Sequence, residues 1–130
     1  MTTNEFSELT VNGTIVTIDG VINSAAQIWN PHPSFEGVQL KHLVTGKNTG
    51  GQLSCHIVRI DPGCTLRSHV HDNQWELHEI IDGSGEATLN SVTTAYHPGK
   101  SAIIPKGELH SVQAGEEGLT LLAKFFPALI

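Results

Sequence analysis

Positively charged residues are scarce in this chain of 130 residues. Lys and Arg together number 7, against 13 Asp and Glu, which gives a net charge of −6 at pH 7. The few cations are scattered along the sequence and form no cluster. Nucleic acids and anionic membrane surfaces are recognised by concentrated positive patches, so neither is expected as a partner.

Long apolar runs and cysteines are also missing or few. No stretch reaches the roughly 18 apolar residues that indicate a membrane-spanning helix. The first residues, Met1 to Phe6, have neither the basic nor the apolar region of a secretory signal. Two cysteines are too few for a disulfide framework and are typical of reduced thiols. We therefore expect a soluble, cytoplasmic protein.

Glycine, by contrast, is frequent. The 13 glycines mostly stand beside Asn, Asp, Pro, Ser or Lys between short β-branched runs, which is typical of turns in an all-β fold. No segment combines a helical period with capping residues, so little helix is expected. Such a pattern favours a sandwich, jelly roll or barrel over a parallel α/β sheet. Strands are expected at residues 14–18, 38–44, 53–60, 76–82, 86–89, 101–104, 110–113 and 119–126.

The N-terminal part of the chain is less regular than the rest. Residues 29–33 contain two prolines and cannot be helical, whereas residues 21–29 could be extended or helical. We expect residues 1–35 to form an arm that packs on the barrel or on a partner subunit. Residues 36–130 then form a single β-barrel domain, a length sufficient for one core.

Two histidines and a glutamate form the most specific pattern in the sequence. His69 and His71 are two residues apart in an extended stretch, so their side chains point to one face, roughly 6 to 7 Å apart. Glu76 opens the next expected strand, and a hairpin would bring its carboxylate beside them. His110 follows a tight turn that begins at Pro105 and can lead a distant strand to the same place. These ligands suit divalent iron, manganese, nickel, zinc or cobalt, so the pattern predicts a metal site.

Two histidines spaced in this way are weak evidence when taken alone, because such pairs are usually exposed or partly packed side chains. The addition of Glu76 and His110, each close to turn residues, makes a metal site the favoured interpretation. The histidines without a partner in the sequence are interpreted as structural or solvated side chains: His32, His42, His56 and His97.

The pattern also resembles a known family. Gly63-x5-His69-x-His71-x4-Glu76-x6-Gly83 and Gly99-x5-Pro105-x-Gly107-x2-His110 are similar to the two motifs of the cupin superfamily. The resemblance covers about residues 50–126 and implies a small single-domain cupin, a double-stranded β-helix or jelly-roll barrel. It also implies that the ligands of a divalent transition metal are His69, His71, Glu76 and His110. The second motif departs only at its final Asn, where Ala114 stands; this puts a packing or turn hydrogen bond in doubt and not the metal.

Two further side chains are candidates for catalysis. His78 should share the face of Glu76 and could move a proton near neutral pH. The alternative is a core histidine held by a hydrogen bond to a neighbour. Arg67 should share the face of His69 and could bind a carboxylate or phosphate. The alternative there is a rim arginine paired with a surface acid.

These features favour a metal-dependent enzyme of isomerase, lyase or dioxygenase type that acts on a small polar organic molecule. The alternative is a non-catalytic binding module that holds a metal and a small ligand. A metal-free reading, in which the chain resembles sugar-nucleotide epimerases, is weakened by Glu76 at a ligand position. The apolar C-terminal run and the N-terminal arm are consistent with the dimers that cupins often form, so a homodimer is expected.

Overall fold

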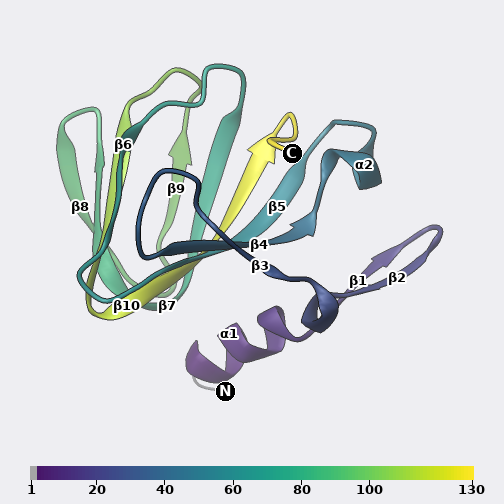
Figure 1. Ribbon diagram of the computed structural model, residues 1–130. Coiled ribbons are helices and arrows are strands. Elements are labelled where there is room, and N and C mark those ends of the chain that lie inside the picture. The colour runs from purple at the N-terminus through teal and green to yellow at the C-terminus, as the bar shows by residue number, and fades with distance from the viewer. Residues whose placement is uncertain (1–2) are drawn as a thin grey trace.

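The computed structural model describes residues 3–130 and is dominated by antiparallel β-structure (Figure 1). Eight strands form one sheet in the order β3-β4-β5-β10-β7-β8, with β6 paired to β10 and β9 paired to β7. The predicted all-β jelly-roll architecture is therefore confirmed. The strands are β3 Trp29–Pro31, β4 Val38–Val44, β5 Ser54–Ile60, β6 Thr65–His69, β7 Trp75–Leu89, β8 Val92–Tyr96, β9 Ser101–Ile104 and β10 His110–Phe126.

β7 and β10 are longer than the sequence indicates. Each was expected as two short strands, because glycines interrupt the β-branched runs, but each continues through its glycines as one bent strand. Gly83 has φ +79°, and a Cβ added there would lie 2.1 Å from the Gly118 carbonyl oxygen. Only glycine allows the two backbones to approach this closely at that φ, so the pair marks the bend.

The bend folds the β7–β10 ribbon back on itself. His110 pairs with Leu89 at one end of the ribbon, and Glu76 pairs with Phe125 at the other. Even so, the side chains of His110 and Glu76 lie 3.1 Å apart. The ribbon therefore contributes strands to two facing layers, with the candidate metal ligands between them.

The interior between the layers is mostly apolar, and its polar parts include the candidate site and the buried Ser54 and His56. Ala114, which replaces the expected Asn, is 3 % exposed within this core, and its backbone N–H donates to the Cys64 carbonyl at 3.0 Å. The turn at Cys64 is thus held by the backbone, without a side-chain amide. The remaining buried core residues are mainly aliphatic: Val38, Val58, Ile60, Leu66, Ile80, Val112, Leu119 and Leu121.

The N-terminal segment begins with a helix, α1 Thr3–Val11, that the sequence did not indicate. Val11 is buried against Leu43 and Ile57 on the outer face of the sheet. The Lys41 ammonium also donates to the Val11 carbonyl at 3.0 Å. A helix this short depends on such tertiary contacts, which are invisible in a local sequence pattern.

A separate hairpin follows α1 and projects from the barrel (Figure 1). It consists of β1 Thr14–Thr17 and β2 Gly20–Asn23, which pair only with each other, and it leads into a short 3-10 helix, Ser24–Ala26. The chain joins the large sheet at β3. The sequence does not decide between extended and helical structure for residues 21–29. In the structure this segment is extended in β2 and at the start of β3, and the 3-10 helix forms a single turn between them.

The β4–β5 connection, expected as a hairpin loop, carries a single-turn helix, α2 Gly46–Thr49, between antiparallel strands. The C-terminal residues fold back over it: the Gly46 N–H donates to the Ile130 carbonyl at 2.6 Å, and the Leu129 N–H to Ser54 Oγ at 2.9 Å. Among residues 3–130, no helix is both long and apolar enough to cross a membrane.

Candidate metal centre

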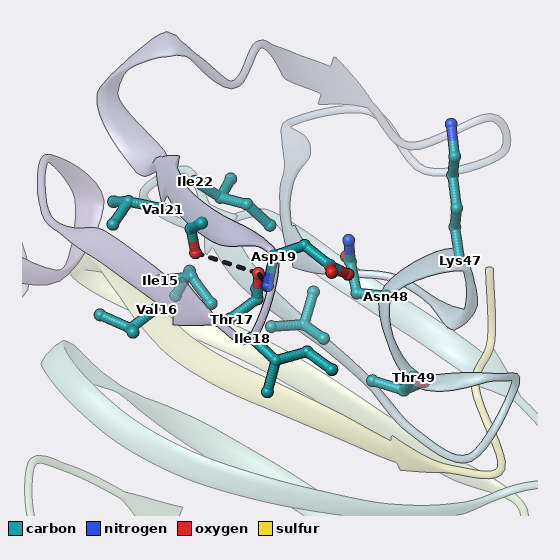
Figure 2. A pocket seen from close by; sticks show the side chains of 12 residues that line it. Ile15, Val16, Thr17, Ile18, Asp19, Val21, Ile22, Lys47, Asn48 and Thr49 are labelled. Atoms are coloured by element: carbon teal, nitrogen blue, oxygen red, sulfur yellow. Dashed lines mark hydrogen bonds between the residues drawn. The ribbon is translucent and has the colours of Figure 1, made fainter.

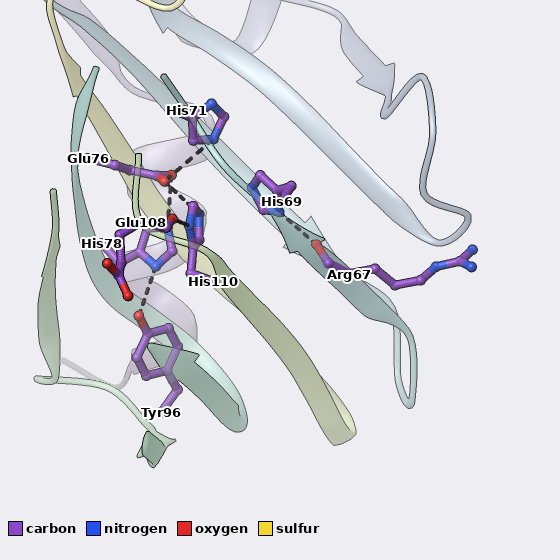
Figure 3. A network of polar contacts seen from close by, with 8 residues as sticks. All are labelled: Arg67, His69, His71, Glu76, His78, Tyr96, Glu108 and His110. Carbon is purple, nitrogen blue, oxygen red and sulfur yellow. Dashed lines mark hydrogen bonds and ion pairs between the residues drawn. The ribbon is translucent and has the colours of Figure 1, made fainter. Parts of the chain in front are cut away.

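Three of the predicted ligands converge at one end of the barrel (Figure 3). His69 is the last residue of β6, His110 is the first residue of β10, and the two are paired in the sheet. His71 lies two residues beyond the end of β6. Ring centroids are 4.2 Å apart for His69 and His110, and 5.0 Å apart for His69 and His71. One ligand atom from each of the three lies within 4.8 Å of the other two.

Backbone carbonyls orient two of these imidazoles. His69 Nδ1 lies 2.7 Å from the Arg67 carbonyl oxygen, and His110 Nδ1 lies 3.0 Å from the Glu108 carbonyl oxygen. A carbonyl oxygen only accepts, so each Nδ1 carries the proton and donates. In the neutral rings the lone pair is then on Nε2. The hydrogen bond from Nδ1 to a backbone carbonyl fixes the tautomer and the direction of each ring, as is typical of metal-ligating histidines.

Glu76, the fourth predicted ligand, is 5 % exposed and reaches the histidines from the facing layer. Its Oε1 lies 3.1 Å from His110 Nε2 and 3.7 Å from His71 Nε2. Burial acts to raise the pKa of this carboxyl, but attraction to His78 and contacts from His110 outweigh it and hold the pKa well below its usual range. Glu76 is therefore a carboxylate at neutral pH.

Two buried atoms at the centre of the cluster lack a hydrogen bond. Within the described part of the chain, Glu76 Oε1 and His110 Nε2 have no partner of acceptable geometry, although they lie close together. Unpaired buried polar atoms are costly unless a water or ion satisfies them. A carboxylate oxygen and imidazole nitrogens facing one point have the chemistry of a divalent transition-metal site, so the residues present fit such an ion.

His78 lies next to this cluster and is fully enclosed, at 1 % exposure. Its Nε2 lies 2.9 Å from Glu76 Oε2, and its Nδ1 lies 2.8 Å from the Tyr96 hydroxyl. Sequence reasoning missed Tyr96, because its place opposite Gly85 depends on the pairing of β7 with β8. Glu76, His78 and His110 form a second group with ligand atoms within 4.8 Å of one another.

Arg67 lies beside the centre, but its side chain extends away from the histidines (Figure 3). It is exposed, and its guanidinium carbon lies 5.8 Å from the centroid of the Phe35 ring. The part of Arg67 that contacts the cluster is its carbonyl, which holds His69. The ring centroid of Phe35 lies 5.8 Å from that of His69. The Phe35 ring also stacks on the His32 ring, with centroids 4.5 Å apart. The β3–β4 loop, which carries Phe35 and His32, therefore forms a rim beside the candidate centre.

His42 and His56, which had no evident partner in the sequence, face each other across β4 and β5. Their Nδ1 atoms lie 2.7 Å apart, and His56 Nε2 lies 2.8 Å from Ser54 Oγ. Burial, together with the nearby His42, lowers the pKa of His56 to about 4. The pair is separated from the cluster of candidate metal ligands by Phe125, whose ring contacts both His56 and His71.

Comparison with known proteins supports the same interpretation of the fold. The sequence profile of the family described as Cupin domain matches residues 56–123, which include all four predicted ligands. A search of curated protein sequences gave no match.

Solved structures with the same fold cover most of the chain at low sequence identity. KdgF from Halomonas sp. is 20% identical over 79% of this chain and 90% of its own, with a TM-score of 0.69. A predicted oxalate decarboxylase from Thermotoga maritima is 20% identical over 82% of this chain and 97% of its own, with a TM-score of 0.74. Oxalate decarboxylase from Bacillus subtilis is 24% identical over 82% of this chain but 28% of its own, with a TM-score of 0.71.

Proposed function

The chain belongs to the cupin family, and from this premise and the geometry of its histidine cluster we propose that it is a metal-dependent enzyme acting on a small polar organic molecule. The observation that carries the proposal is the pair of unsatisfied buried atoms, Glu76 Oε1 and His110 Nε2. Glu76 Oε1 lies 3.7 Å from His71 Nε2, and the ring of His110 lies beside that of His69. The reaction is of isomerase, lyase or dioxygenase type, the classes that an ion with open coordination positions supports.

The four ligands are the Nε2 atoms of His69, His71 and His110 and the Oε1 atom of Glu76. They would hold divalent iron, manganese, nickel, zinc or cobalt. Such an ion, when bound, would polarise a carbonyl or hydroxyl oxygen of the substrate. Three neutral imidazoles and one carboxylate offset about one of its two positive charges, so the centre favours a substrate with a carboxylate or an ionisable hydroxyl. The fold shared with proteins named oxalate decarboxylase makes small carboxylates the first class to test.

The substrate should approach from the side of His69 and His71, because these two rings are partly exposed whereas Glu76 and His110 are buried. The rim on that side carries His32, whose Nδ1 accepts the backbone N–H groups of Ser34 and Phe35 at 3.1 and 3.2 Å. The ring proton of neutral His32 is therefore on Nε2, which makes that atom a donor for a substrate oxygen.

Arg67 also belongs to this rim, through its contact with Phe35. We propose that Arg67 attracts an anionic substrate to the rim of the site. It does not contact the reacting atoms, because its side chain leads away from the cluster (Figure 3). An exposed cation of this kind changes the rate of substrate capture more than the rate of the chemical step.

The second candidate is a non-catalytic binding module that holds a metal and a small ligand. One observation favours it: both ring nitrogens of His78 contact Glu76 and Tyr96, so this residue is not poised to move a substrate proton. The experiment that separates the two candidates is ¹³C NMR of ¹³C-labelled small carboxylates and hydroxy acids incubated with metal-loaded protein. Consumption by wild type but not by His110→Ala supports the enzyme, whereas binding without consumption supports the module.

We further propose a homodimer formed through the N-terminal hairpin. A groove of about 1000 Å³ runs between the hairpin and α2 (Figure 2). Val16, Val21 and, at the tip, Ile18 are exposed apolar side chains on the hairpin. An isolated two-stranded hairpin is at best marginally stable in water, so a covering partner is expected. A second hairpin suits the groove, since its Asp19 could meet Lys47 at the opposite wall.

A further inference from the structure

A buried row of polar contacts leads from the candidate metal centre into the apolar core (Figure 3). Tyr96, His78 and Glu76 are 2 %, 1 % and 5 % exposed. The Tyr96 hydroxyl lies 2.8 Å from His78 Nδ1, and His78 Nε2 lies 2.9 Å from Glu76 Oε2. Both distances are those of good hydrogen bonds. With so little contact with water, these groups depend on one another for their hydrogen bonds.

The chemistry of the three groups fixes the position of each proton. The Glu76 carboxylate only accepts, so the hydrogen bond to Oε2 needs a proton on His78 Nε2. A His78 ring with its single proton on Nε2 has its lone pair on Nδ1, and the Tyr96 O–H then donates to it. A tyrosine hydroxyl can supply this donor in the core without adding a charge.

We propose that Tyr96 and His78 are positioning residues that turn one oxygen of Glu76 toward the metal and keep His78 itself off the metal. Oε2 is occupied by the N–H of His78, so Oε1 is the oxygen presented to His71 and His110. This inference rests on the proposed metal site and adds to it an assignment of the ligand atom.

The assignment also decides between the two groups of residues whose ligand atoms lie close enough to hold an ion. The group of Glu76, His78 and His110 requires a lone pair on His78 Nε2, and the hydrogen bond to Oε2 places a proton there. The group of His69, His71 and His110 has no such conflict, because two of its rings donate from Nδ1. The ion therefore belongs with the latter group and Glu76 Oε1.

The substitution that tests the row is Tyr96→Phe. Tyr96 is the one tyrosine of the chain, and phenylalanine keeps its ring in the core while removing the O–H donor. Without that donor, His78 can carry its proton on Nδ1, which turns a lone pair toward Oε2 and releases the carboxylate from its orientation. Loss of an outer hydrogen-bond partner of a ligand typically weakens metal binding by about 10- to 100-fold.

A matched control exists elsewhere in the barrel. Ser54 is fully buried, and its hydroxyl lies 2.8 Å from an imidazole nitrogen of His56, the same distance as in the Tyr96–His78 contact. Ser54→Ala removes a hydroxyl–histidine contact of the same kind outside the Glu76 row. It should leave metal affinity unchanged if the effect of Tyr96→Phe is specific.

The experiment has two readouts on the full chain. Long-range ¹H–¹⁵N NMR of the metal-free protein should show His78 protonated on Nε2 in wild type and shifted toward Nδ1 in Tyr96→Phe. Competition with a chromophoric chelator should show Zn²⁺ or Mn²⁺ bound about 10- to 100-fold more weakly by Tyr96→Phe and equally by Ser54→Ala. His78→Gln, which keeps an amide donor, should retain more affinity than His78→Leu.

Wild-type His78 protonated on Nδ1 would overturn the proposal, and so would unchanged metal affinity in a folded Tyr96→Phe protein. If wild type binds no metal, the proposed function is wrong, and this result is distinct from the two above. The His78 tautomer, measured in the metal-free protein, would still decide whether Tyr96 and His78 orient Glu76.

Discussion

His110 Nε2 and Glu76 Oε1 lie 3.1 Å apart although their backbones are paired at opposite ends of the β7–β10 ribbon. His110 is opposite Leu89, whereas Glu76 is opposite Phe125. The contact exists because the ribbon bends near Gly83 and brings its two ends to face each other. The geometry of the candidate metal centre is therefore a consequence of the bend as much as of its four side chains.

The first prediction concerns the carboxylate. Glu76→Gln keeps the shape of the side chain but replaces a charged oxygen ligand with a neutral amide, so binding of Zn²⁺ or Mn²⁺ should weaken by more than about 100-fold, beyond the loss expected for an outer-sphere change. Isothermal titration calorimetry measures this directly. Glu79→Gln, on the outer face of β7 and paired with Lys124, is the control and should bind like wild type. Equal affinity in all three proteins would remove Glu76 from the ligand set.

The second prediction concerns the bend. Gly83→Ala places a Cβ against the Gly118 carbonyl at a positive φ and should lower the free energy of unfolding by about 3 kcal/mol or more. Gly63→Ala also has a positive φ, +73°, but no atom within 4 Å of its Cβ, so it should cost only about 1 kcal/mol. Urea unfolding of the two variants checks the difference. Equal losses would mean that the close approach of the two strands is unimportant.

The third prediction concerns pH. Burial lowers the pKa of His56 from 6.5 to about 4, so the unfolded chain takes up a proton on this residue at a higher pH than the folded one. His56 carries no pH-dependent penalty above about pH 6.5, and folding stability falls as the pH drops toward 4, by a total of roughly 3 kcal/mol.

Urea unfolding of the metal-free protein at several pH values tests this. His56→Gln should be less stable than wild type at neutral pH, but its stability should fall less steeply between pH 6.5 and 4. His97→Gln, a substitution at an exposed position, should follow the wild-type slope. Parallel curves for wild type and His56→Gln would contradict the assignment of this titration to His56.

The fourth prediction concerns the hairpin. Wild type should sediment as a dimer at about 100 μM, and Ile18→Asp should sediment as a monomer because a charge replaces a fully exposed apolar side chain at the hairpin tip. Val92→Asp alters another exposed apolar side chain, on β8, and should stay dimeric. A monomeric wild type, or dimers in both variants, would exclude the hairpin as the interface.

Much of the candidate site could be predicted because its residues are close in sequence or follow turn residues. His69, His71 and Glu76 lie within eight positions, and the period of an extended chain places the two histidines on one face. The structure brings His110 to the same point through pairing with His69. The fold class followed in the same way from turn residues between short strands.

Features that depend on the pairing of distant strands could not be predicted. Tyr96 reaches His78 only because β8 lies beside the second half of β7, and His42 reaches His56 only through the β4–β5 register. The sequence leaves His78 open between a proton carrier and a core histidine held by a neighbour, and it does not indicate that the neighbour at its second nitrogen is Tyr96. Helix α1 likewise depends on Val11 and Lys41, contacts that local propensity does not contain.

The metal centre is tested by the metal content of the purified protein, measured by inductively coupled plasma mass spectrometry with His71→Ala prepared in parallel. We expect about one equivalent of a divalent transition metal in wild type and the loss of most of it in the variant. A full equivalent retained by His71→Ala would contradict the ligand assignment. A wild type that stays metal-free after incubation with each of iron, manganese, nickel, zinc and cobalt would contradict the metal centre itself.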